Sequence, residues 1–191
     1  MADAVSICNL ALQRLGARAI SQLTEDTTSG RACNRVYTQA RDSELRAHPW
    51  SFARERVQVA ADSTDPIFGA AKKYAIPADC LRILPTNGTN ASAVQDDWQI
   101  EGRFILTDDS SPINLIYLKK ITDENTFDAL FTELLVARIA MDVAEKVTQS
   151  NKKKEDAVLH YSATKKEARR INAFERPPQD FPQDTWLEAR L

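Results

Sequence analysis

The sequence predicts an α+β fold with three parts: a four-helix bundle, a small antiparallel β-sheet domain and an extended C-terminal tail. Three patterns predict it. Apolar residues recur at helical spacing in the first and last thirds of the chain, the middle alternates apolar and polar residues as strands do, and the final stretch is rich in proline. We place the bundle at residues 1–50 and 119–175, the inserted sheet domain at 51–118 and the tail at 176–191.

Two helices are predicted before the sheet domain. The first begins at Asp3, whose side chain can cap free backbone N–H groups, and stops at Gly16. Its apolar stripe is wide, so we expect this helix to be covered on more than one side. The second covers residues 29–47 and ends before Pro49, because proline disfavours the helical conformation in the residue that precedes it.

The middle of the chain carries the signals of strands. Gly102 lies between two short alternating runs, which predicts a tight hairpin. Both alternating sets of the last expected strand contain apolar residues, which predicts a strand that is covered on both faces or lies at an interface. Trp50 and Phe52 are expected to fill the joint between helices and sheet, with an exposed recognition patch as the alternative. The expected strands cover residues 51–60, 81–84, 98–101, 103–107 and 113–118.

Helical spacing returns after the sheet domain. Residues 123–149 are apolar nearly all round, which predicts the central helix of the bundle. Residues 151–174 are amphipathic, with Val158, Tyr161, Ala168 and Ile171 on the side expected to pack. We expect the bundle to cover the apolar helix, and part of the remaining amphipathic surface to meet a neighbouring copy of the chain.

The tail differs in composition from the rest of the chain. It contains three prolines within residues 177–182, which prevent a helix and favour an extended segment. Large apolar residues are unusual in a solvated terminus, so we expect those of the tail to bind another protein. These expected anchors are Phe181, Trp186, Leu187 and Leu191.

Composition argues against several classes of protein. The chain is 43% hydrophobic and 27% charged, which is ordinary for a folded soluble protein. A net charge of −2 and a pI of 5.8 lack the basic footprint of a protein that grips nucleic acid. Asp3 stands where a secretory signal would carry Lys or Arg, and no apolar run is long enough for a membrane span. We expect synthesis in a cytoplasm and no membrane partner.

Residues that bind metals or act as nucleophiles are few. Cys8, Cys33 and Cys80 are widely spaced, so we expect small buried residues and neither a disulfide framework nor a metal site. His48 and His160 are the only histidines and are expected to be structural. The sequence therefore predicts no metal site and no cofactor.

Five short motifs follow one another along the chain: residues 7–12 (ICNLAL), 48–52 (HPWSF), 74–82 (YAIPADCLR), 98–102 (WQIEG) and 127–131 (FDALF). Together with the order of helix, helix, small sheet, apolar helix, amphipathic helix and extended tail, they resemble the tail tubular protein A family, the head-to-tail adaptors of short-tailed bacteriophages. The resemblance covers nearly the whole chain up to Phe174.

The resemblance implies a structural protein of the virion, located at the head-tail junction. It implies a dodecameric ring of identical subunits beneath the portal protein, with the helices nearest the portal and the sheets toward the tail nozzle protein. DNA passes through the lumen without specific binding, and because tightly held phosphates would impede ejection we expect a neutral to acidic lumen. The C-terminal segment of relatives docks on the portal, a role that falls here to the tail.

Two other functions compete with this one. A tail-associated polysaccharide or peptidoglycan hydrolase requires two carboxylates at a defined separation, for which Asp96-Asp97 and Asp108-Asp109 are the visible candidates. A DNA-packaging factor requires a continuous basic stripe, but acidic residues interrupt the lysine-rich runs of residues 152–170. Adjacent acidic pairs beside turns are common in a chain with 27 acidic residues, so we predict no catalytic site and no enzyme.

Overall fold

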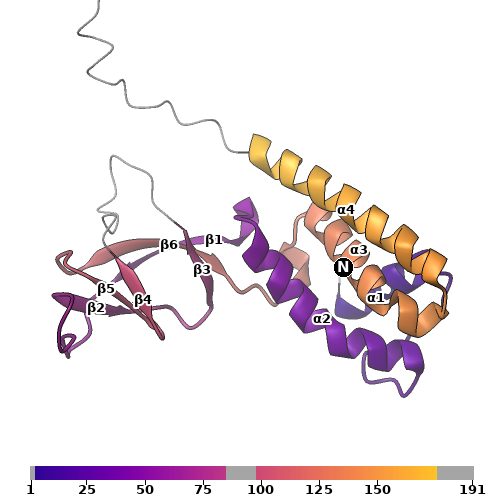
Figure 1. Cartoon of the computed structure of the whole chain (residues 1–191), viewed down its shortest axis with the longest axis horizontal. Helices are drawn as coiled ribbons and strands as arrows, with labels where there is room; N and C mark the ends of the chain where they lie inside the picture. Colours follow the sequence, from indigo (N-terminus) through magenta and orange to yellow (C-terminus); the bar gives the residue numbers. More distant parts are fainter. Residues whose placement is uncertain (1–2, 85–97, 176–191) are drawn as a thin grey trace, which may run out of the picture.

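The computed structural model describes residues 3–84 and 98–175, and within these ranges the protein is a mixed α+β structure. Figure 1 shows helices gathered at one end and strands at the other. We call these the helical unit and the sheet unit. The helices of the helical unit are α1 (Ala4–Arg14), α2 (Thr28–Ala47), α3 (Ala129–Thr148) and α4 (Asn151–Phe174).

The sheet unit contains two three-stranded antiparallel sheets, where the sequence predicted one. The first sheet has the order β1-β6-β3 and the second β2-β5-β4. Gly102, at a φ of +57°, turns the predicted hairpin between β4 and β5, and β2 pairs with the other edge of β5. The strands are β1 (Arg54–Val59), β2 (Lys72–Ala75), β3 (Cys80–Leu84), β4 (Gln99–Glu101), β5 (Phe104–Thr107) and β6 (Ile113–Lys119).

Side-chain caps fix the helix ends. The Asp3 carboxylate accepts a hydrogen bond from the backbone N–H of Ser6 at 2.8 Å, and the Ser6 hydroxyl accepts one from the backbone N–H of Asp3 at 2.9 Å. His48 is extended ahead of Pro49 and ends α2. The predicted start of α3 was wrong: residues 124–126 form a short 3₁₀ turn, and the Asp128 side chain caps a helix that begins at Ala129.

Helix α3 lies at the centre of the helical unit and packs against α1, α2 and α4. This confirms the predicted central helix. Apolar residues all round α3 allow three neighbours to cover it at once, which a one-sided stripe would not. Its buried residues are Phe131, Leu134, Leu135, Val136, Ala137, Ile139, Ala140, Val143 and Ala144.

The packed face of α4 differs from the predicted one. Val158 is 39% exposed and Leu159 is 69% exposed, whereas Ala157 and Ala168 are buried. Including Val158 in the packed face was therefore wrong. The packed side of α4 therefore carries buried alanines, whereas Val158 and Leu159 face solvent.

Strand β6 belongs to both hydrophobic cores. Ile113 and Leu115 join the smaller core between the two sheets, with Tyr74 and Ile105 of the second sheet. Leu118 is fully buried in the larger core of the helical unit. The predicted coverage of this strand on both faces is confirmed.

Four aromatic rings fill the joint between the two units, as predicted for Trp50 and Phe52. Trp50 is 1% exposed, and its ring meets that of Phe131 edge-on at a centroid distance of 5.2 Å. Phe52 lies 5.1 Å from Phe131 and 6.2 Å from Phe127. Because these rings come from the α2–β1 connection and from the start of α3, they pack the chain segments that enter and leave the sheet unit.

Candidate functional site

The two histidines have different environments. His48 Nε2 lies 3.1 Å from Asn172 Oδ1, and its ring packs edge-on against Trp50. Asn172 Nδ2 also donates to Ser51 Oγ at 3.0 Å and to Glu175 at 2.9 Å, so these contacts tie the end of α4 to the joint between the units. His160 is exposed on α4.

Acidic pairs were the candidate catalytic groups of the hydrolase alternative. Asp108 accepts a hydrogen bond from the backbone N–H of Ala71 at 2.8 Å, and the Asp109 carbonyl accepts one from the Tyr74 hydroxyl at 2.8 Å. Burial, followed by the nearby Asp109 charge, raises the pKa of Tyr74. These contacts hold the segment after β5 against β2 and the residue that precedes it. The pair at residues 96–97 lies outside the described residues.

Two of the three cysteines are buried, as predicted for all three. Cys8 and Cys33 are 0% exposed in the larger core, and Cys80 at the start of β3 is half-buried. Among residues 3–84 and 98–175, no cluster of three or more His, Cys, Asp or Glu side chains is placed to hold a metal ion.

A buried polar cluster joins α2, α3 and α4 around Glu44, whose side chain is 2% exposed. Glu44 Oε1 accepts a hydrogen bond from Arg138 at 2.9 Å and from the Tyr161 hydroxyl at 2.5 Å. Lys165 Nζ lies 3.7 Å from Glu44 Oε2 and donates to the Tyr161 hydroxyl at 2.7 Å. Arg138 also pairs with Asp142 at 2.9 Å. This cluster fixes the three helices relative to one another.

Two lysines at the start of α4 make contacts within the protein. Lys153 Nζ donates to the Leu15 carbonyl at 2.7 Å, which satisfies a carbonyl at the end of α1. Lys154 pairs with Glu145 at 2.5 Å. These contacts agree with a mixed-charge face and reduce the positive charge that could track a nucleic-acid backbone.

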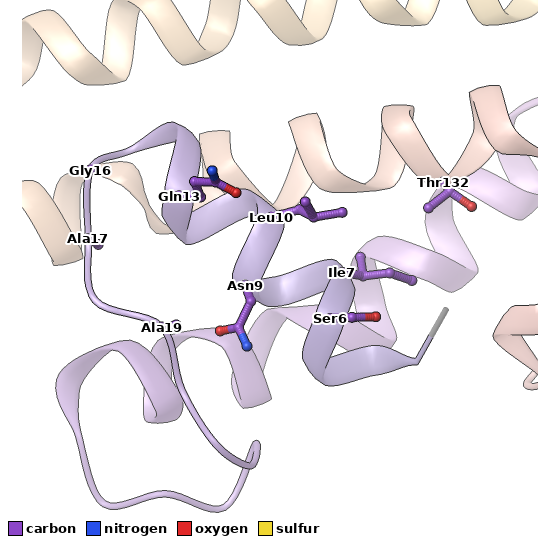
Figure 2. A pocket seen from close by; sticks show the side chains of 9 residues that line it. All are labelled: Ser6, Ile7, Asn9, Leu10, Gln13, Gly16, Ala17, Ala19 and Thr132. Carbon is purple, nitrogen blue, oxygen red and sulfur yellow. The ribbon is translucent and has the colours of Figure 1, made fainter. Parts of the chain in front are cut away.

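An open groove runs beside α1, between this helix, the chain that follows it and α3 (Figure 2). Its volume is about 730 Å³. Leu10 and Gln13 of α1 and Thr132 of α3 also line an adjoining groove of about 520 Å³. Leu10 is 48% exposed there, although α1 is otherwise a core helix. The residues that line the first groove are Ser6, Ile7, Asn9, Leu10, Gln13, Gly16, Ala17, Ala19 and Thr132.

The loop between β1 and β2 carries two large apolar residues in solvent. Ile67 is 98% exposed and Phe68 is 86% exposed. Isolated exposed apolar residues are normal on protein surfaces, whereas two adjacent ones at a loop tip are a candidate contact surface. The surrounding segment, Asp65-Pro66-Ile67-Phe68-Gly69, has the composition of a turn, a signal that sequence analysis could have used.

The predicted portal-binding anchors Phe181, Trp186, Leu187 and Leu191 lie outside the described residues. The chain reaches them from the end of α4, where Phe174 is 75% exposed. In the part of the chain that the structure describes, no helix has the length and apolar character needed to cross a bilayer.

Sequence reasoning missed the Glu44 cluster, the groove beside α1 and the apolar tip. The first two depend on how helices distant in sequence pack together, so no local sequence pattern indicates them.

A comparison with known proteins gives the chain no family: no family model and no curated protein matches it.

Proposed function

We propose that the chain is a structural head-to-tail adaptor of a bacteriophage virion, a subunit of a ring that joins the portal to the tail nozzle. The observation that carries this proposal is the presence of distinct apolar surfaces at separate places on one subunit. The groove beside α1 lies on the helical unit and the Ile67–Phe68 tip on the sheet unit. A subunit that must meet a neighbour and further partners needs such separate surfaces.

The use of the Glu44 and Asp108 carboxylates in internal contacts also supports a structural role. Arg138 and Tyr161 both donate hydrogen bonds to Glu44, and Asp108 accepts one from the backbone N–H of Ala71. We propose that α1 to α4 act as one four-helix bundle, formed by residues 1–50 and 119–175, which carries the sheet domain of residues 51–118.

In the proposed ring, the bundle faces the portal and the sheets face the nozzle. DNA passes through the lumen without specific binding.

Imaging tests the assembly directly. The purified protein is mixed with the portal protein of the same virus and examined by negative-stain electron microscopy, with the protein alone as control. We expect rings of identical subunits on the portal and monomers in its absence. A protein that stays monomeric beside the portal contradicts the adaptor function, and turnover of capsule or cell-wall polysaccharide would favour the hydrolase.

Leu10→Asp tests whether the groove beside α1 takes part in the ring. Leu10 is 48% exposed, so the charge is tolerated in the monomer, but it would lie desolvated in an interface that covers the groove. We expect an unchanged melting temperature and loss of rings on the portal. Gln39→Asp, at an exposed position of α2, is the matched control and should assemble normally. Normal rings with Leu10→Asp would place the subunit contact elsewhere.

A further inference from the structure

Helix α4 lies on the outside of the helical unit (Figure 1) and carries a stripe of apolar and basic residues on its outward face. Its members follow one another at intervals of seven or four residues, which places them on one side of a helix. Leu159 is 69% exposed and Phe174 is 75% exposed, whereas Ala157 and Ala168 on the opposite side are buried. The residues of this outer stripe are Lys152, Leu159, Lys166, Arg170 and Phe174.

The three cations of the outer stripe are not used inside the described part of the protein. Among the described residues, the side chains of Lys152, Lys166 and Arg170 make no hydrogen bond or ion pair. Lys153 and Lys165, on other sides of α4, do make such contacts within the helical unit. The helix as a whole has seven Lys and Arg residues against three Asp and Glu residues. Its outer stripe therefore favours an occupant that is both acidic and apolar.

Residues 177–189 of the tail have the complementary composition. This segment, which lies outside the described residues, holds three acidic residues and no Lys, Arg or His. Its acidic residues are Asp180, Asp184 and Glu188, and its large apolar residues are Phe181, Trp186 and Leu187. Acidic and apolar side chains therefore interleave in a segment that is covalently attached to the end of α4.

We infer that residues 177–188 dock back along the outer stripe of α4 in the same chain. The length of the connecting chain allows this contact. Leu159 lies 16 residues before Glu175, which is about 24 Å along a helix. Trp186 follows Glu175 by 11 residues, which span up to about 36 Å when extended. The aromatic residues therefore reach Leu159 while the carboxylates lie beside the three cations.

Covalent attachment to α4 favours this occupant over a separate molecule. Docking within one chain loses no translational freedom, so contacts that are individually weak are sufficient. Exposed ion pairs contribute little each, and burial of aromatic area against Leu159 and Phe174 adds to them. The docked residues include the anchors that the proposed function assigns to the portal, so the portal would have to displace the tail from α4. The contact itself needs no partner protein and does not rest on the ring.

Carbodiimide cross-linking of the full-length protein tests the contact. The reagent joins an amine to a carboxylate where the two groups touch, so Lys166 should become linked to residues 180–188, as read by mass spectrometry of tryptic peptides. We expect the double variant Leu159→Ser, Arg170→Glu to lower the yield of this link roughly 10-fold. Both side chains are exposed, so the melting temperature should not change. Lys146→Glu, at an exposed position of α3, is the matched charge control and should give the wild-type yield.

Three outcomes would overturn the inference. The first is the absence of a link between Lys166 and the tail, and the second is an equal yield in the double variant. The third is a link between labelled and unlabelled peptides in a mixture of isotope-labelled and unlabelled protein, which would assign the site to the tail of another copy. A wild-type protein that shows the link within one chain but forms no ring on the portal loses the proposed function and keeps this contact.

Discussion

Arg138→Met is expected to lower the free energy of unfolding by about 3 kcal/mol, the lower end of what breaking a buried ion pair costs. The substitution keeps much of the aliphatic stem and removes the charge, so the buried Glu44 carboxylate loses its 2.9 Å partner. Lys165, at 3.7 Å, and the Tyr161 hydroxyl remain beside Glu44 and limit the loss. Urea unfolding followed by circular dichroism measures the change.

Two further variants make this prediction specific. Arg14→Met removes an ion pair with Glu133 in which both side chains are partly exposed, and should cost well under 1 kcal/mol. The double variant Glu44→Met, Arg138→Met removes both charges and should be more stable than Arg138→Met alone, because the buried carboxylate that has lost its closest cation is removed as well. Additive losses in the double variant would contradict the view that the penalty arises from Glu44 left without its partner.

Removal of residues 176–191 is expected to leave folding nearly unchanged and to weaken attachment to the portal roughly 1,000-fold. Aromatic anchors at the centre of an interface commonly contribute about 2 kcal/mol each, and 1.4 kcal/mol corresponds to a tenfold change in affinity. Trp186→Ala alone should weaken attachment roughly 30-fold on the same basis. Surface plasmon resonance on immobilised portal measures both effects.

The position of the cut matters. Glu175 accepts a hydrogen bond from Asn172 at the joint between the units, so the truncation should keep Glu175. A truncated protein that unfolds would show that the removed segment contributes to the folded subunit. A truncated protein that still binds the portal with full affinity would show that the anchors are dispensable.

Local chemistry predicted the helices well because their ends are local events. The side chain of Asp3 caps α1, and Pro49 keeps His48 extended, so α2 ends at Ala47. The start of α3 was placed too early because apolar spacing continues through Phe127, while the cap that starts the helix is Asp128. Spacing indicates a helix, and the cap decides where it begins.

Strands and surfaces were harder to predict. The strand β2 contains Lys72 and Lys73 and only four residues, so its pairing with β5 is what makes it a strand. Val158 has the right spacing for the packed side of α4, but the buried residues of that helix are Ala157, Ala168 and Asn172. Burial of Glu44 likewise depends on the meeting of three helices, which no single segment determines.

Strand β6 has a mechanical consequence for the proposed ring. Because β6 is held in the smaller core by Leu115 and in the larger core by Leu118, a swing of the sheet unit against the helices would pull Leu118 out of the larger core. We therefore expect the sheet unit and the helical unit of each subunit to move together as one rigid body under load. We expect any widening or narrowing of the DNA passage during ejection to come from whole subunits tilting against one another.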